Sequence, residues 1–410
     1  MTVKRSAPRA KADKWEFQAR FRRNAFGWRS QPAVTRIKQA VAEIKRVAKR
    51  EPTLAAEGAV VFLERVSPAL EHVDSSSGSV GAAVNYAIGE LVPLIANAPA
   101  DAKARDAWLE RLFEALQADQ IPYIERLAEH WGELCGSKQT AATWADRLVG
   151  ITRMALSPDK SLRGHFPGTS ACLSALYRAE RFDDLIGLLH VETFWPYKKW
   201  AVHALAAKGQ KAEAIRYAES CRGPWASELQ IDSTCEEILL SSGLLDEAYA
   251  RYGARSHQGG TYLATFRAVT KKYPHKAAGE VLADLVKTTP GDEGKWFAAA
   301  KEAGLYADAL ELAARTPCDP KTLSRAARDH ASEQPAFAVG AGLLALHWLA
   351  QGYGYEITSA DVWDAYRATL SAADRLGTAP EVRDRIRKMV AAEGARDRLV
   401  AKVLGREFGL

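Results

Sequence analysis

The chain has 410 residues, 47% of them hydrophobic and 26% charged, with a formal net charge of +6. This length and composition predict a folded soluble protein of two to three domains that buries a sizeable core. No stretch approaches eighteen uninterrupted apolar residues, and no apolar segment follows the first basic residues. These observations argue against a membrane protein or a secreted one, so we expect a cytoplasmic protein that makes no membrane contact.

Positive charge is concentrated at the N-terminal end. Residues 1–50 contain fifteen Lys and Arg against three acidic residues, a balance of +12, so residues 51–410 sum to −6. Clustered positive charge attracts polyanions, whereas a dispersed surplus mainly aids solubility. Residues 14–30, KWEFQARFRRNAFGWRS, combine five aromatic with five basic residues. We therefore treat residues 1–33 as a basic aromatic arm with a role in binding partners.

Two interpretations of this arm are open. In the first, the segment is an amphipathic helix whose Trp15, Phe17, Phe21 and Phe26 dock onto the first helix pair while its arginines stay in water. In the second, the arm and a lysine face of the next helix contact a phosphate backbone without sequence preference. The candidate residues for binding nucleic acid or another anion are Trp15, Arg20, Arg22, Arg23, Trp28, Arg29, Lys38, Lys45 and Lys49.

The segment that follows, residues 34–156, has helical spacing throughout. The first predicted helix covers residues 34–50, and the next two cover about 53–66 and 80–98. In the first helix, apolar residues recur at intervals of three and four on one stripe: Val34, Ile37, Val41, Ile44 and Ala48. Helical runs such as AWLERLFEALQ continue the pattern. On this pattern the segment resembles the antiparallel helix pairs of HEAT or armadillo repeats.

A repeat becomes visible beyond residue 165. The phrases LAAKGQKAEAIRYAE, LLSSGLLDEAYARYG and AKEAGLYADALELAA each place a glycine in a turn, with an alanine five residues later. A fourth phrase, LYRAERFDDLIGLL, has the same apolar rhythm with Arg181 where the glycine would stand. The turn positions are 28, 34 and 61 residues apart, close to one or two periods of about 34. Residues 168–315 therefore resemble tetratricopeptide-like repeats, although the family's Trp-Leu-Gly-Tyr set is incomplete.

These resemblances imply an all-α fold, an α-solenoid with HEAT-like and then tetratricopeptide-like helix pairs in a right-handed superhelical stack. Each pair of helices would bury its apolar face by stacking on the next pair. Residues 320–410 are predicted to form a C-terminal helical cap. Within this cap, AFAVGAGLLALHWLAQ is an apolar helix in which Gly340 and Gly342 allow a neighbouring helix to approach closely.

Sequence signatures of catalysis and metal binding are missing. The chain has no G-x-S-x-G, no P-loop and no Rossmann glycine fingerprint, and His190 and His203 lack the spacing that directs two imidazoles at one metal. Its five cysteines contain no C-x-x-C pair, which favours reduced, buried thiols. We therefore expect no catalytic residues, no bound metal and no cofactor.

The sequence thus favours a non-enzymatic scaffold that binds a protein partner, with a basic arm as an electrostatic anchor whose contact with nucleic acid is one of the open interpretations. One alternative is a sequence-tolerant nucleic-acid-binding protein in which the arm and the first helices do the main work. A second is an enzyme acting on DNA, because some HEAT-like solenoids are DNA glycosylases that use a carboxylate and tryptophans. The abundance of alanine and the preference for arginine over lysine favour a GC-rich bacterial source.

Overall fold

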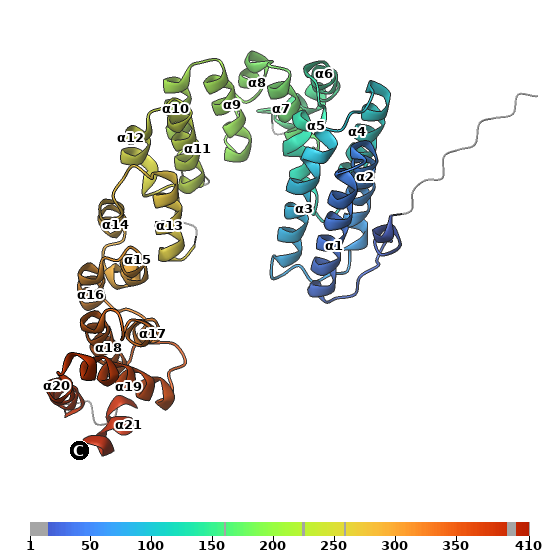
Figure 1. Cartoon of the computed structure of the whole chain (residues 1–410). Coiled ribbons are helices and arrows are strands. Elements are labelled where there is room, and N and C mark those ends of the chain that lie inside the picture. Colours follow the sequence, from blue (N-terminus) through green and yellow to red (C-terminus); the bar gives the residue numbers. More distant parts are fainter. Residues whose placement is uncertain (1–14, 160, 224–225, 258–259, 392–398, 410) are drawn as a thin grey trace, which may run out of the picture. The chain divides into compact units, whose positions relative to one another are not determined.

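The computed structural model describes residues 15–159, 161–223, 226–257, 260–391 and 399–409 (Figure 1). These residues form helices, turns and loops without a β-strand, which confirms the predicted all-α class. The chain divides into two compact units, Met1–Ser227 and Glu228–Leu410. Each unit is described below by itself.

The first unit is built from helices that pack against their neighbours in the chain. In Figure 1, α1, α2 and α3 lie alongside one another, and α4 packs on α2. Farther along, α5 and α6 pack on α7, and α9 packs between α8 and α10. The elements are η1 (Glu16–Ala19), α1 (Ser30–Ala48), α2 (Pro52–Ala69), α3 (Ser79–Ala96), α4 (Ala102–Gln117), η2 (Glu125–His130), α5 (Trp131–Leu134), α6 (Lys138–Ala155), α7 (Thr169–Arg178), α8 (Phe182–Leu188), α9 (Trp195–Ala207) and α10 (Lys211–Ser220).

The apolar stripes of these helices form the core. Ile37, Val41 and Ile44 of α1 are buried, as the spacing predicts. Among the described helices, α3 alone is long and apolar enough to span a membrane by length and composition. Its apolar stripe packs against α1 and α2, as the stripe of a core helix does. The helix continues through Pro93, which lies on its exposed face in the last turn.

The second unit ends in a compact group of helices. Its earlier helices pack on near neighbours, with α13 against α14 and α15, and α15 against α16. Next, α17, α18 and α19 pack pairwise, and α20 and α21 cover α18 and α19. The elements are α11 (Glu228–Leu240), α12 (Leu245–Ala248), the π-helical turn η3 (Tyr249–Gly253), α13 (Tyr262–Lys272), α14 (Ala278–Lys287), η4 (Glu293–Trp296), α15 (Phe297–Glu302), α16 (Tyr306–Arg315), α17 (Pro320–Asp329), α18 (Pro335–Ala350), α19 (Ser359–Leu376), α20 (Ala379–Ala391) and α21 (Leu399–Phe408).

The turns of the predicted repeat share one backbone geometry. Gly209, Gly243 and Gly304 have φ angles of 82°, 75° and 73°, a left-handed conformation that favours glycine. In each turn the following residue donates its N–H to a carbonyl five residues back. The fourth turn has the same hydrogen bond, but its left-handed residue is Glu180, with a φ of 58°. The prediction that Arg181 occupies the glycine position of the fourth turn was therefore wrong by one residue, because Glu180 occupies it.

Close helix packing around the glycines of α18 confirms another expectation. A Cβ atom at position 340 would lie 2.6 Å from Cδ1 of Leu310 on α16. A Cβ atom at position 342 would overlap the side chain of Thr369, a fully buried residue of α19. Only glycine permits these approaches without a shift of the neighbouring side chain.

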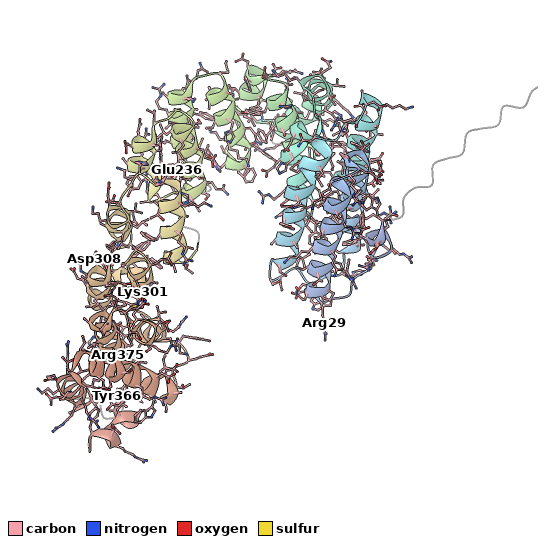
Figure 2. All side chains as sticks on the ribbon, viewed as in Figure 1. Arg29, Glu236, Lys301, Asp308, Tyr366 and Arg375 are labelled. Atoms are coloured by element: carbon pink, nitrogen blue, oxygen red, sulfur yellow. The ribbon has the colours of Figure 1, made fainter. Side chains whose placement is uncertain are left out.

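A buried ionic cluster lies in the second unit, where Figure 2 labels Glu236. The Glu236 carboxylate is fully buried and accepts hydrogen bonds from Tyr273 and from Lys272, the latter at 2.7 Å. Nε2 of His257 lies 3.6 Å from the same carboxylate. Burial alone would raise the pKa of Glu236, but His257, Lys272 and Tyr273 outweigh it and lower the pKa to about 2. The cluster therefore holds a charged carboxylate inside the unit.

Candidate functional site

The arm from residue 15 onward belongs to the core of the first unit. The side chains of Phe17 and Phe21 are buried and pack edge-to-face on Phe62 of α2, with ring centroids 5.7 and 5.1 Å away. Trp15 is 6% exposed, and its indole fills the space that a Cβ atom at Gly58 would need. Docking of Trp15, Phe17 and Phe21 is therefore confirmed, but residues 15–29 form only the short 3-10 helix η1, so the expected amphipathic helix was wrong. Residues 1–14 of the predicted arm lie outside the described residues.

Backbone hydrogen bonds hold the docked arm at several points. At its start, the Glu43 carboxylate of α1 accepts from the backbone N–H groups of Glu16 and Phe17, at 2.8 and 3.2 Å. At its far end, the Asn24 N–H donates to the Pro68 carbonyl at 3.0 Å. The Trp28 carbonyl then accepts from the N–H of residue 74 at 2.9 Å. The arm is thus fixed along its described length.

Two of the predicted arginines make polar contacts with neighbouring helices. Arg20 donates to the side-chain oxygen of Gln39 on α1 at 3.4 Å. Arg23 pairs with Glu71, which follows α2, also at 3.4 Å. Both arginines remain exposed, and exposed contacts of this length add little stability. Each guanidinium group therefore stays accessible to another anion.

The remaining predicted cations also lie at the surface. Lys45 forms an ion pair with Glu90 of α3, and this contact raises the pKa of Lys45. Figure 2 shows Arg29 at the N-terminal end of α1. Four of these side chains have no hydrogen-bond or ion-pair partner among the described residues: Arg22, Arg29, Lys38 and Lys49.

The two candidate tryptophans have opposite environments. Trp28 is 73% exposed, so its ring is free to stack on a planar ligand group, whereas Trp15 is core. The structure therefore brings eight of the nine candidate residues to the surface and removes Trp15 from it. Residues 15–50 contain ten Lys and Arg against two Glu, a balance of +8. We call the solvent side of the docked arm and of α1 the basic surface.

A cavity of about 450 Å³ lies elsewhere in the first unit, beside η2 and the start of α9. Three carboxylates line it, those of Asp119, Glu125 and Glu129, together with the aromatic rings of Phe194 and Tyr197. Burial raises the pKa of Asp119, although hydrogen bonds from Ser67 and the residue 124 N–H oppose this effect. Sequence reasoning missed this cavity because its residues come from segments that are far apart in the chain.

A second cavity, of about 350 Å³, shares Glu129 with the first. The Glu129 carboxylate pairs with Lys199 at 3.0 Å, so its charge is balanced. Glu133 and Trp200 also line this cavity, and the buried Nε1 atom of Trp200 has no hydrogen-bond partner among the described residues. Glu133 and Trp200 therefore line the same cavity.

Neither a metal site nor a related protein points to a function for the described residues. Within the described part of the chain, no group of three or more His, Cys, Asp or Glu side chains is arranged to hold a metal ion. No protein-family model and no curated protein matches the sequence. Among the described residues, the basic surface is the best-defined candidate site.

Proposed function

We propose that the chain is a non-catalytic cytoplasmic scaffold that binds a protein partner and contacts nucleic acid through its basic surface. In this proposal the helix pairs form a right-handed α-solenoid, HEAT-like in the N-terminal part and tetratricopeptide-like from residue 168 to 315. The repeated turn geometry at Gly209, Gly243 and Gly304 supports such an arrangement. Stacked helix pairs offer extended surfaces that suit a peptide or a partner subunit.

The main support for nucleic-acid binding is the attachment of the arm to the core. Because Trp15, Phe17 and Phe21 are buried, the neighbouring guanidinium groups start from a fixed backbone. A fixed site loses less conformational entropy on binding than a mobile tail does. Lys and Arg contacts to phosphates are independent of base sequence, and exposed Trp28 can stack on an unpaired base.

The salt dependence of binding follows from the number of free cations. Each phosphate contact adds about 0.9 to the slope of log affinity against log salt on duplex DNA. If Arg22, Arg29, Lys38 and Lys49 each contact a phosphate, the slope is about 3.6. Raising salt from ~50 to ~200 mM should then weaken binding by about two orders of magnitude.

The test is a fluorescence-polarisation titration of the full chain against labelled duplex and single-stranded DNA and RNA at both salt concentrations. The double variant Arg22→Glu/Arg29→Glu should lose at least about tenfold in affinity and reduce the slope by about 2. A matched control, Lys103→Glu/Arg153→Glu, changes the same amount of charge at exposed positions of α4 and α6. Equal losses of nucleic-acid affinity in both variants, or an affinity that does not change with salt concentration, would refute the basic surface as the site.

A second candidate function, an enzyme acting on DNA, is favoured by the cavity that Glu129, Glu133 and Trp200 line. This function requires one carboxylate to act on a base held in that cavity. Glu133→Gln should then abolish base release from damaged duplex DNA without weakening DNA binding. Absence of base release by the unaltered chain would reject this candidate.

A further inference from the structure

A groove of about 520 Å³ lies between α17 and α19 in the second unit. Lys321, Arg325 and Arg328 follow one stripe of α17 at intervals of four and three residues, and all three line the groove. Leu349 of α18 and Ala368 of α19 add apolar surface to its lining. Its volume is within the range of small ligand sites, and its lining combines charge with apolar contact.

The carboxylates on the α19 side of the groove are already partnered. Asp361 lies 3.8 Å from Nζ of Lys321 and also accepts the Thr358 backbone N–H at the start of α19. Asp364 pairs with Arg367 one turn along the same helix, at 3.0 Å. Each carboxylate therefore offsets one cation of the groove.

Two arginines of α17 supply the remaining charge. Arg325 has no hydrogen-bond or ion-pair partner among the described residues and is exposed. Among the described residues, Arg328 forms an ion pair only with its sequence neighbour Asp329, at 3.0 Å, and both side chains are more than half exposed. Exposed pairs of this kind are weak. The groove lining thus has four cations against two carboxylates, a balance of +2, with the surplus at Arg325 and Arg328.

We propose that this groove binds an acidic segment of a protein partner. Carboxylates of the segment pair with Arg325 and Arg328, whose planar guanidinium groups match a carboxylate in two-point contact. An apolar side chain of the segment packs against Ala368 and the small exposed part of Leu349. The inference rests on the proposed scaffold function and specifies the chemistry of its partner.

The distribution of positive charge along α17 favours a peptide segment that carries several carboxylates over a single compact anion. Arg328 lies seven positions after Lys321, which corresponds to about 10 Å along α17. A peptide with carboxylates one or two helical turns apart can meet these cations in sequence. A single phosphate reaches only part of this length, so it can pair with only some of these cations.

The experiment measures fluorescence polarisation of a labelled probe peptide of ~14 residues, about four helical turns, titrated with the full chain. The probe has glutamates at helical i, i+4 spacing and leucines on the adjoining stripe, and a matched probe has glutamine at every glutamate position. We expect saturable binding of the acidic probe and at least about tenfold weaker binding of the glutamine probe. Equal binding of the two probes would overturn the inference, and this comparison needs no variant protein.

Variants then locate the site. Arg325→Glu/Arg328→Glu should weaken binding of the acidic probe at least about tenfold. Arg375→Glu, at an exposed position of α19 outside the groove lining, should leave it unchanged (Figure 2). Unchanged binding by Arg325→Glu/Arg328→Glu, or displacement of the probe by millimolar inorganic phosphate, would overturn the assignment.

The basic surface of the first unit is the competing site for an acidic probe. Arg22→Glu/Arg29→Glu must therefore leave probe binding unchanged, and loss of binding in this variant would reject the groove. Conversely, Arg325→Glu/Arg328→Glu should retain the nucleic-acid affinity of the unaltered chain. If Arg325→Glu/Arg328→Glu loses probe binding and keeps nucleic-acid binding, the groove is the site of the acidic segment. If Arg22→Glu/Arg29→Glu loses nucleic-acid binding and keeps probe binding, the basic surface is a separate site and the groove assignment is supported.

Discussion

The variant Trp15→Ala tests whether buried aromatic residues hold the basic arm in place. Trp15 is 6% exposed, and truncating a buried tryptophan to alanine costs about 3–5 kcal/mol. Trp15 belongs to the arm that precedes α1 and its indole packs over Gly58, so we expect the loss to appear as local opening of the arm. A cost of about 3 kcal/mol corresponds to an opening equilibrium roughly 100-fold larger.

Native-state hydrogen exchange measures this opening directly. The Asn24 amide, which donates to the Pro68 carbonyl in the docked arm, should exchange roughly 100-fold faster in Trp15→Ala. Amides of the second unit should keep their protection. The control Trp28→Ala removes the same side chain from a position that is 73% exposed, and it should change nothing. Unchanged protection at Asn24 in Trp15→Ala would refute the anchoring role of Trp15.

Two further predictions concern the second unit and the helix glycines. The lowered pKa of Glu236 stabilises the fold above its unfolded value of 4.5, and this stabilisation is lost as pH falls toward about 2. Urea denaturation between pH ~6 and ~2 should therefore show a smaller acid-dependent loss of stability in Glu236→Gln than in the unaltered chain, and identical profiles would contradict this assignment. Gly342→Ala should lower the free energy of unfolding by about 1–3 kcal/mol because its Cβ overlaps Thr369. Gly81→Ala on α3, where a Cβ meets nothing within 4 Å, should instead raise it by about 0.5–1 kcal/mol, and equal effects would reject the packing argument.

Local patterns were sufficient to predict the fold class. The stripe of Ile37, Val41 and Ile44 is encoded within one helix, and these residues are buried as expected. Turn glycines are also a local requirement, since a left-handed backbone favours glycine wherever it occurs. Glu180 adopts that conformation without being glycine, so the sequence gives no signal for its position.

The candidate sites depend on contacts between distant residues. Trp15 and Trp28 belong to the same aromatic stretch, and the burial of Trp15 depends on the missing side chain at Gly58. Arg325 and Asp364 share a groove only because α17 and α19 pack together. Helical periodicity says which face of a helix is apolar but not which neighbour covers it, so neither contact could be predicted from the sequence.

The docked arm also determines where the chain can be shortened. Removing residues 1–30 would delete Trp15, Phe17 and Phe21 from the core together with the arginines, so any loss of binding would combine damage to the fold with loss of charge. A chain that begins at residue 15 keeps every docked aromatic residue, and the charged residues that it omits are five Lys and Arg and one Asp. The difference in nucleic-acid affinity between this shortened chain and the full chain therefore isolates the electrostatic share of residues 1–14.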